Sequence, residues 1–396
     1  MLLDHAGFDR KARIVTILDE MMGGLEISPS QRELAQQRYE AVGRWLASSG
    51  VLMLRDLYIY LQGSTALGTT VKPIGHNEHD VDLVAHRPSY EAVEPAVLKR
   101  AIGDRLRENG NYAPLLEEMP RCWRLVYANE FHMDITPAIP NAQCSNGGEL
   151  VPDRALRRWK TSNPKGYKRE FERRAALKPQ FRLNKSLQFD AKRADKNVEP
   201  YPVATGFKGV LRRMVQIGKR HRDIHFVDLD PCLAPISVII TTLAAWSYEY
   251  CVAAKVYESE LDLACEVVRY MPAFIEERSV DGRRQWFIWN DTTAGENFAE
   301  KWNKHPERAE AFFSWHQRLM ADLDALNEVE GMDRLNKGLR DAFGAAPVDR
   351  VFGRINEEVA TARRSGLLGL APAAGLSVAA TSVPVRANTF FGAPPR

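Results

Sequence analysis

The sequence predicts an α+β fold, with a mixed sheet and helices in its first half and an all-helical second half. Two observations support this prediction. Residues 57–138 contain short β-branched and aromatic runs of alternating polarity, which indicate strands. From residue 206 to about residue 364, apolar residues recur instead at helical spacing. We therefore expect two domains, residues 1–205 and 206–364, followed by a flexible tail, residues 365–396, rich in Ala, Gly, Pro and Ser.

Four runs in the first half are predicted to be strands because apolar and polar residues alternate along them. They are residues 57–63, 79–86, 122–128 and 130–138. Only Asn129 separates the last two runs, so we predict that they form a hairpin.

Helices are predicted on both sides of these strands. Residues 31–48 place apolar side chains at helical spacing, after Ser28 and Pro29 supply a cap and a first-turn proline. Residues 89–109 are predicted to form a helix between strands. In the second half, residues 235–250 are predicted to form a buried helix that begins at a proline.

Composition and charge exclude several classes of protein. The 54 Lys and Arg residues nearly balance the 51 Asp and Glu residues, so the whole surface is not basic like that of a histone. The five cysteines are scattered without a Cys-x-x-Cys pair, which argues against a disulfide scaffold or a zinc ribbon. The start of the chain has no apolar signal sequence, and the apolar run of residues 235–246 is too short to span a bilayer. We expect a cytoplasmic protein without a membrane partner.

One segment is strongly basic. Residues 154–196 contain fifteen Lys and Arg residues against four acidic ones. Such a run is either a solvated surface or a surface that meets phosphate groups, and the sequence leaves both interpretations open.

Three carboxylates and a Gly-Ser pair form the candidate catalytic site. Gly63 and Ser64 end a predicted strand, Asp80 and Asp82 lie in the next one, and Asp134 lies in the strand 130–138. Side chains two residues apart point to the same face of a strand, so Asp80 and Asp82 share a face. Each motif alone is weak. Together, flanked by apolar residues, they favour catalysis, because an apolar strand is a poor place for unneeded carboxylates.

The chemistry of this cluster indicates a magnesium site. Three neighbouring carboxylates repel one another and raise each other's pKa values, and a divalent cation removes this cost. A few hard oxygen ligands that leave room for a substrate phosphate suit Mg²⁺ better than Zn²⁺ or Ca²⁺. Two such ions can hold the attacking and leaving oxygens of a phosphoryl transfer. Gly63 lets the backbone approach a phosphate, and the hydroxyl of Ser64 can bind its oxygens.

The segments around these motifs resemble the polymerase-β-like nucleotidyltransferases. Within that superfamily they resemble the bacterial cGAS/DncV-like enzymes, called CD-NTases. The resemblance covers most of residues 50–345, and the ending NTFFG with the stretch LGTTVKPI resembles the clade called CdnG. The segments that carry it are QGSTALGTTVKPIGHNEHDVDLV, FHMDITPAIP, WKTSNPKGYKREFERR, LRRMVQIGKRHRD and PISVIITTLAAWSY.

The resemblance implies a bilobal enzyme with its active site in the cleft between the lobes. The first lobe would be a polymerase-β-like nucleotidyltransferase core, and the second an OAS-like helical domain. Such enzymes join ATP and/or GTP into a cyclic di- or trinucleotide and release pyrophosphate. The product is a second messenger that activates an effector in CBASS anti-phage defence.

The resemblance also implies roles for individual residues. Asp80, Asp82 and Asp134 would hold two Mg²⁺ ions, for which Mn²⁺ can substitute, and Asp134 would help deprotonate the attacking ribose hydroxyl. Gly63 and Ser64 would bind the β- and γ-phosphates.

Two residues of the second lobe complete the site that the resemblance implies. Lys219 and Ser237 stand where the family has a lysine and a serine that grip the donor triphosphate. Arg220 and Arg222 are alternatives to the lysine, because they lie within one helical turn of it.

Two further expectations concern partners. The animal DNA sensor of this family carries a zinc ribbon of His and Cys residues, and this sequence has no such cluster, so no zinc-ribbon DNA sensing is expected. Some bacterial relatives end in a small residue that an E1/E2-like enzyme conjugates to other molecules. Here the chain continues from Gly392 to Arg396, so the tail is either such a conjugation site or a disordered linker.

Three functions remain open from the sequence. The first is cyclic purine nucleotide synthesis, and the second is a nucleotidyltransferase that modifies RNA ends or AMPylates a protein. The third is a silent RNA- or partner-binding module, against which the complete set of three carboxylates argues. The helical second half favours the first function over the second, because minimal AMPylating relatives lack it.

Overall fold

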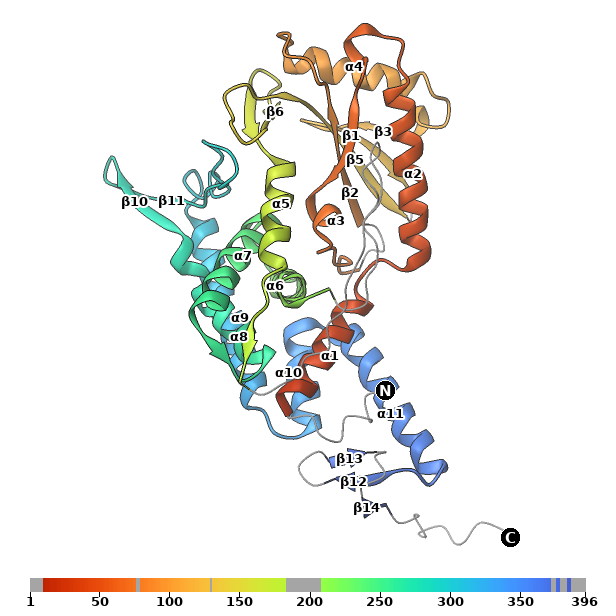
Figure 1. Cartoon of the computed structure of the whole chain (residues 1–396), viewed down its shortest axis with the longest axis vertical. Helices are drawn as coiled ribbons and strands as arrows, with labels where there is room; N and C mark the ends of the chain where they lie inside the picture. Colours follow the sequence, from red (N-terminus) through yellow and green to blue (C-terminus); the bar gives the residue numbers. More distant parts are fainter. Residues whose placement is uncertain are drawn as a thin grey trace.

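The computed structural model describes residues 10–75, 79–128, 130–182, 208–371, 375–377 and 383–385. Figure 1 shows two lobes, a sheet lobe with helices along the sheet and a helical lobe below it. The α+β fold class predicted from the sequence is confirmed.

The sheet lobe is built on one mixed sheet with the central strand order β1-β2-β5-β4-β3. β2 and β5 run parallel, whereas the other central pairs are antiparallel, including the predicted β4–β5 hairpin. Asn129, at the turn of that hairpin, lies outside the described residues. The strands are β1 (Tyr58–Gln62), β2 (His79–His86), β3 (Leu116–Glu118), β4 (Trp123–Tyr127), β5 (Phe131–Pro140), β6 (Glu149–Pro152) and β7 (Trp159–Ser162), with β6 pairing with β5 and with β7.

An apolar core fills one face of this sheet. The helices α2 (Pro29–Ala47) and α4 (Pro95–Arg107) supply its other side. The predicted cap of α2 is present, because Ser28 accepts from the backbone N–H of Gln31 and the Gln31 side chain accepts from the Ser28 N–H. The opposite face of the sheet carries Asp80 and Asp82 together with a small apolar cluster of Tyr60, Val84 and Ala138.

The helical lobe has its own apolar core. The helices that build most of it are α1 (Arg10–Gly24), α6 (Val210–His225), α7 (Ser237–Ala254), α8 (Glu260–Tyr270), α9 (Glu307–Glu328), α10 (Met332–Phe343) and α11 (Ala345–Arg364). Between the lobes lie α3 (Gly63–Leu67) and α5 (Pro164–Ala175). The remaining short elements are η1 (Leu52–Leu54), η2 (Ala113–Leu115), η3 (Pro231–Leu233), η4 (Met271–Phe274), β8 (Gln180–Phe181) and β9 (Val256–Tyr257).

The first helix differs from the expected domain plan. The sequence-based division grouped the N-terminal helices with the first domain. In the structure α1 packs against α6, α8 and α11, and its side chains Ile14, Ile17 and Met21 are buried in the core of the helical lobe. Hydrophobic spacing predicts a helix but does not say which core the helix joins. The predicted boundary at 205/206 lies outside the described residues.

The second half also contains a hairpin where only helices were expected. β10 (Glu276–Val280) and β11 (Arg283–Phe287) pair antiparallel and project from the lobe (Figure 1). Asp281 and Gly282 join them, with φ of +51° and +71°. Positive φ at both central residues is typical of the Asp-Gly hairpin turn, so a signal for this hairpin was present in the sequence.

The tail has more structure than its composition predicts. Three short strands, β12 (Gly369–Ala371), β13 (Gly375–Ser377) and β14 (Val383–Pro384), form a small sheet after α11. The NTFFG motif and the candidate conjugation site at Gly392 lie outside the described residues.

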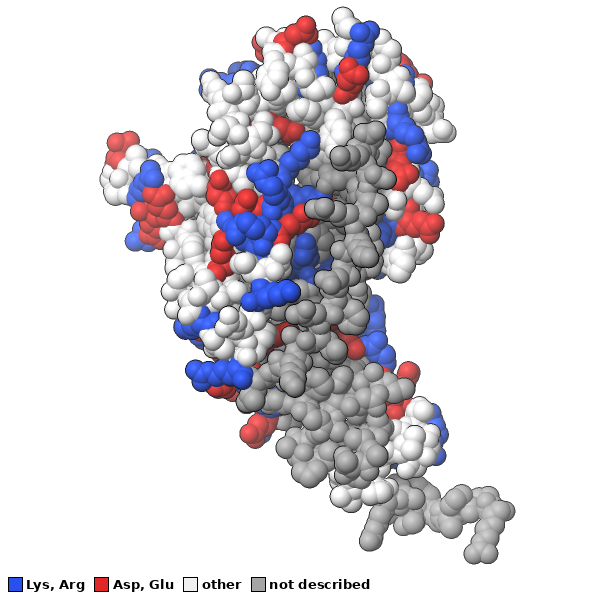
Figure 2. All heavy atoms as spheres, viewed as in Figure 1, with Lys and Arg blue, Asp and Glu red and all other residues white. Residues whose placement is uncertain are grey.

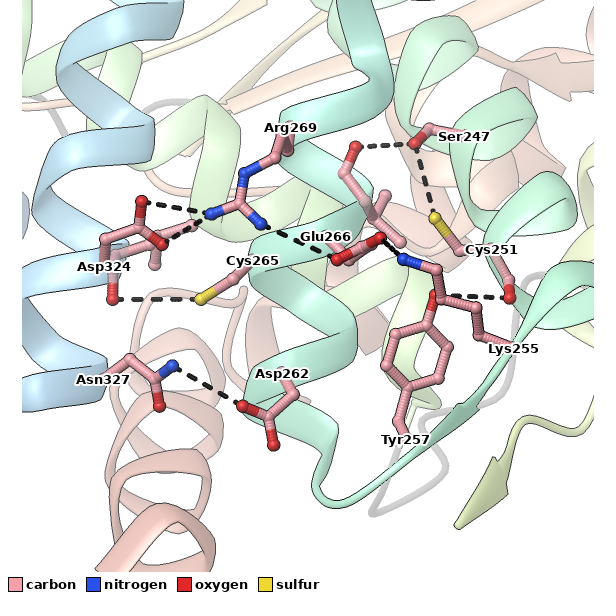
Figure 3. Close-up of polar contacts among 12 residues, drawn as sticks. Ser247, Cys251, Lys255, Tyr257, Asp262, Cys265, Glu266, Arg269, Asp324 and Asn327 are labelled. Atoms are coloured by element: carbon pink, nitrogen blue, oxygen red, sulfur yellow. Dashed lines mark hydrogen bonds and ion pairs between the residues drawn. The ribbon is translucent and has the colours of Figure 1, made fainter.

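Polar contacts join α7, α8 and α9 of the second lobe (Figure 3). The Ser247 hydroxyl on α7 donates to the Val267 carbonyl of α8 at 2.6 Å. Arg269 of α8 pairs with Asp324 of α9, with an N–O distance of 3.1 Å. These contacts, together with the apolar core, tie α7 to α8 and α9.

In contrast to the short run 235–246 considered from the sequence, the helical segment Pro231–Ala254, which includes α7, is long and apolar enough to cross a membrane by length and composition alone, with a mean hydropathy of 1.4 over an 18-residue window. Ile239, Ile240 and Leu243 of this segment are buried in the core of the helical lobe, as expected of the central helix of a globular lobe.

The basic segment is partly neutralised where it is described. Figure 2 shows Lys and Arg side chains gathered over α5 with acidic side chains directly beside them. Arg173 and Arg174 of α5 pair with Glu249, and Lys160 pairs with Glu300. Residues 183–196 of this segment lie outside the described residues.

Candidate active site

The parallel pair β2–β5 brings the three predicted carboxylates together. Asp82 of β2 is the register partner of Asp134 of β5, and Asp80 is the register partner of His132. All three carboxylates lie on the face opposite the apolar core, because the flanking Val81, Leu83, Met133 and Ile135 are fully buried in that core. Alternation along two adjacent strands is therefore sufficient to build the cluster.

The three carboxylates differ in their surroundings. The Asp80 side chain is 66% exposed, whereas that of Asp134 is 17% exposed. Asp82, on the same strand as Asp80 and opposite Asp134 in the register, is partly buried. Burial, followed by the negative charges of Asp80 and Asp134, raises the pKa of Asp82 to about 7, although Arg124 and Lys219 oppose the shift. The cluster thus carries an unfavourable excess of negative charge, which a bound cation would relieve.

Arg124 of β4 holds the third carboxylate and was missed by the sequence analysis. Its Nε lies 2.6 Å from Asp134 Oδ1, and its Nη2 lies 2.8 Å from Asp134 Oδ2. Register would have shown this contact, because a β4–β5 hairpin centred on Asn129 places Arg124 opposite Asp134. The pairing also raises the pKa of the guanidinium.

These oxygen ligands suit Mg²⁺, but they are not assembled as a finished metal site. Over the described ranges, no three Asp, Glu, His or Cys side chains are grouped so that they could hold an ion together. Both oxygens of Asp134 accept hydrogen bonds from Arg124. Asp80, Asp82 and Asp134 remain the residues that would hold a cation.

Gly63 lies directly against Asp82. β1 ends at Gln62, the register partner of Asp82, and α3 begins at Gly63 with φ of +65°. A Cβ at position 63 would lie 2.4 Å from Asp82 Oδ2. Both the backbone conformation and the contact therefore require glycine here.

Two hydrogen bonds, one at Ser64 and one at the next residue, hold Ser64 in place at the start of α3. Its carbonyl accepts from the Thr69 N–H at 2.9 Å. The next residue, Thr65, donates through Oγ1 to the Asp80 carbonyl at 3.3 Å. The Gly-Ser pair is thus fixed beside the strand that carries Asp80 and Asp82.

Lys219 faces the segment that follows α3. It is 4% exposed, and its Nζ donates to the carbonyl and hydroxyl of Thr69 at 3.0 and 3.1 Å. Burial, followed by the charge of Arg222, lowers the pKa of Lys219 to about 7, while the nearby Asp223 and Asp82 oppose this.

Ser237 has a different neighbour from the one expected. It begins α7 and accepts from Arg222 Nη1 at 3.1 Å. Arg220 points elsewhere, because its Nε donates to the Phe343 carbonyl of α10 at 2.9 Å. Arg222 therefore contacts Ser237, whereas Lys219 contacts Thr69 and lies near Asp82. Arg220 contacts neither Ser237 nor Thr69 through the hydrogen bond of its Nε.

Comparison with known proteins finds a family model and curated relatives that match this chain. Residues 13–174 match the family model described as the Second Messenger Oligonucleotide or Dinucleotide Synthetase domain (SMODS). A c-di-GMP synthase of Roseivirga ehrenbergii is 29% identical over 96% of this chain and 98% of its own length. Residues 13–174 therefore resemble a CD-NTase domain. The cyclic dinucleotide synthase CdnG of Bradyrhizobium diazoefficiens is 26% identical over 94% of this chain and 90% of its own length.

Solved structures show that the fold is shared. The Bradyrhizobium diazoefficiens CdnG structure in complex with GTP matches with a TM-score of 0.65 and 20% identity, covering 87% of this chain and 98% of that chain. An Escherichia coli CdnC structure with ATP matches with a TM-score of 0.55 and 12% identity, covering 80% and 91%. Together with the family-model match and the two curated relatives, the shared fold bears out the predicted resemblance to the bacterial cGAS/DncV-like nucleotidyltransferases.

Proposed function

We propose that this protein is a Mg²⁺-dependent synthase that joins ATP and/or GTP into a cyclic purine di- or trinucleotide and releases pyrophosphate. The observation that carries the proposal is the pairing of Asp82 with Asp134 on adjacent parallel strands, with Gly63 packed against Asp82. The c-di-GMP synthase that matches nearly the whole chain supports a cyclic dinucleotide as the product and GTP as a substrate.

Asp80, Asp82 and Asp134 are the residues that would hold two Mg²⁺ ions, for which Mn²⁺ can substitute. When bound, the ions neutralise phosphate charge and activate the attacking hydroxyl. Asp134 accepts the proton of the attacking ribose 3′- or 2′-hydroxyl, and Arg124 orients its carboxylate for this task. Catalysis by this site thus depends on position and charge more than on covalent chemistry.

The remaining predicted residues bind the donor nucleotide. Gly63 and Ser64 bind the β- and γ-phosphates, because glycine lets the backbone approach and the hydroxyl donates. Lys219 supplies a cation close to the carboxylates, and Ser237 supplies a hydroxyl from the start of α7. Arg222 joins this set because its guanidinium already contacts Ser237.

The cellular role that follows is second-messenger synthesis in the cytoplasm for CBASS anti-phage defence. The cyclic product would activate a downstream effector. Conjugation of the tail by an E1/E2-like partner is a separate proposal. Incubating the purified protein with such an enzyme pair and ATP tests it, and the absence of a covalent adduct would reject it.

The decisive experiment identifies the product. The protein is incubated with radiolabelled ATP and GTP and Mg²⁺ or Mn²⁺, treated with phosphatase, and the product is analysed by mass spectrometry. A phosphatase-resistant cyclic nucleotide supports the proposal, and the Asp80→Ala/Asp82→Ala double variant should make none while remaining folded. Label on RNA or on protein would favour RNA-end modification or AMPylation instead, and no turnover at all would favour a binding module.

A further inference from the structure

Four side chains at one end of the second lobe hold the backbone of the segment that follows α3. This segment, residues 67–70, is called the clamped segment below. Each of its carbonyls accepts a hydrogen bond from a different donor. The bonds are Arg212 Nε to Leu67 at 2.9 Å, Lys208 Nζ to Gly68 at 3.3 Å, Lys219 Nζ to Thr69 at 3.0 Å and Gln216 Nε2 to Thr70 at 2.9 Å.

Helical geometry explains how one element makes these contacts. Arg212, Gln216 and Lys219 follow at spacings of four and three residues, so they lie on one face of α6. The clamped segment leaves α3 through Gly68, whose φ is +68°. The Leu67 carbonyl ends α3 and lacks a partner within that helix, and α6 supplies its donor; Lys208, the fourth donor, lies just before α6.

The donors Gln216 and Lys208 are themselves buried and anchored. Gln216 is fully buried, and Lys208 is 8% exposed. Glu26 accepts from Gln216 Nε2 at 3.2 Å and pairs with Lys208 at 2.8 Å. Gln216 Oε1 accepts from Arg213 Nη1 at 2.8 Å. A change in the clamped segment would therefore leave several buried polar groups without partners, which makes the observed arrangement costly to disturb.

The clamped segment is connected directly to the phosphate-binding serine. The Thr69 N–H donates to the Ser64 carbonyl at 2.9 Å, and the Gly68 N–H donates to the Thr65 carbonyl at 3.2 Å. Thr65 in turn contacts the Asp80 carbonyl. A path of hydrogen bonds thus runs from α6 through the clamped segment to Ser64 and to the strand that carries the carboxylates.

We propose that Arg212 and Gln216 are positioning residues, which fix Ser64 for phosphate binding through the clamped segment. This inference rests on the proposed function, since it assigns Ser64 to the donor triphosphate. Neither residue needs to touch the substrate. Through these two residues the helical lobe sets the geometry of a phosphate site that belongs to the sheet lobe.

The test compares Arg212→Met with a matched control, Arg105→Met. Arg105 of α4 also donates to a carbonyl near a helix end, that of Trp45, and lies over the Trp45 ring as Arg212 lies over the Phe171 ring, but on the far side of the sheet. Hydrogen exchange of the full-length protein is followed by mass spectrometry in peptides covering residues 63–72. We expect Arg212→Met to speed exchange there at least tenfold, whereas Arg105→Met leaves it unchanged.

Kinetics and binding provide the second readout. Arg212→Met should raise KM for the nucleoside triphosphate about tenfold with kcat changed less than threefold, and Arg212→Lys should recover part of the loss. Arg105→Met should leave both constants unchanged. Should Arg212→Met not fold, Gln216→Met carries the same comparison. Exchange in residues 63–72 no faster than in the control, or an unchanged KM, would overturn the inference.

The two proposals fail in different ways. If the wild-type protein makes no cyclic nucleotide, the proposed function fails. In that case hydrogen exchange, together with binding of a non-hydrolysable GTP analogue in Mg²⁺, still decides whether α6 orders the site. Faster exchange with unchanged analogue affinity would show a structural contact only and would reject the positioning role.

Discussion

Replacing Asp82 by Asn should stabilise the metal-free protein at neutral and alkaline pH. The pKa of Asp82 is raised from its ordinary value of 3.8 to about 7 by burial and by the negative charges of Asp80 and Asp134. Below about pH 4 the carboxyl is protonated in both the folded and the unfolded chain. Between about pH 4 and 7 the unfolded chain ionises while the folded chain keeps its proton, so the folded state loses stability as the pH rises.

The size of this effect follows from the shift. At 1.36 kcal/mol per pKa unit, a rise from 3.8 to about 7 corresponds to about 4 kcal/mol. The side chain is not fully enclosed, and water screens part of the repulsion, so we expect about half of this. Asp82→Asn should therefore raise the free energy of unfolding by about 2 kcal/mol at pH 8 and should leave it unchanged near pH 4.

Urea denaturation in EDTA at several pH values measures the effect. Asp80→Asn is the matched control, because Asp80 lies on the same strand and face but is mostly exposed, so its gain should be under about 0.5 kcal/mol. Added Mg²⁺ should stabilise the wild type more than Asp82→Asn. Parallel stability curves for the wild type and Asp82→Asn from pH 4 to 8 would refute the reasoning.

Three further predictions concern neighbouring residues. Gly63→Ala should lower the free energy of unfolding by about 1–3 kcal/mol and turnover at least a hundredfold, measured by calorimetry and product assay, because the new Cβ meets Asp82 and the φ is left-handed. Lys219 has a lowered pKa, so the free energy of unfolding of the wild type should rise from about pH 7 to 10. Lys219→Met should remove this rise in urea titrations. The same variant should bind nucleotide about tenfold more weakly. Arg124→Leu should lower kcat more than tenfold, because Asp134 loses its orienting contacts, while Arg124→Lys should recover part of the activity. Equal kcat for Arg124→Leu and wild type would exclude an orienting role.

Local patterns were enough to predict the part of the site that depends on alternation. The strands, the shared face of Asp80 and Asp82, and the adjacency of Asp134 follow from a period of two along short apolar runs. The contact of Arg124 with Asp134 follows only from the register of the β4–β5 hairpin. Counting residues outward from Asn129 gives that register. The placement of these residues agrees with the prediction, whereas their catalytic and metal-binding roles stay predictions.

Other features could not be read from local patterns. The contacts of Arg212 and Gln216 join segments about 145 residues apart in the chain, so no spacing rule indicates them. The position of α1 is likewise not predictable from spacing, because its apolar side chains could pack in either lobe. Which lobe it joins depends on the shape of the completed core. The Asp281-Gly282 hairpin lies between two helical stretches, and helical periodicity averaged over the whole region does not separate it from them.

The placement of α1 means that the second lobe is not a continuous stretch of chain. A fragment that starts after residue 205 would leave the surface normally covered by Ile14, Ile17 and Met21 open to water. Such a fragment would self-associate, whereas adding residues 10–24 as a separate peptide should restore a monomer. Evolution of this protein by exchange of whole lobes would therefore need two breakpoints, one on each side of the sheet lobe.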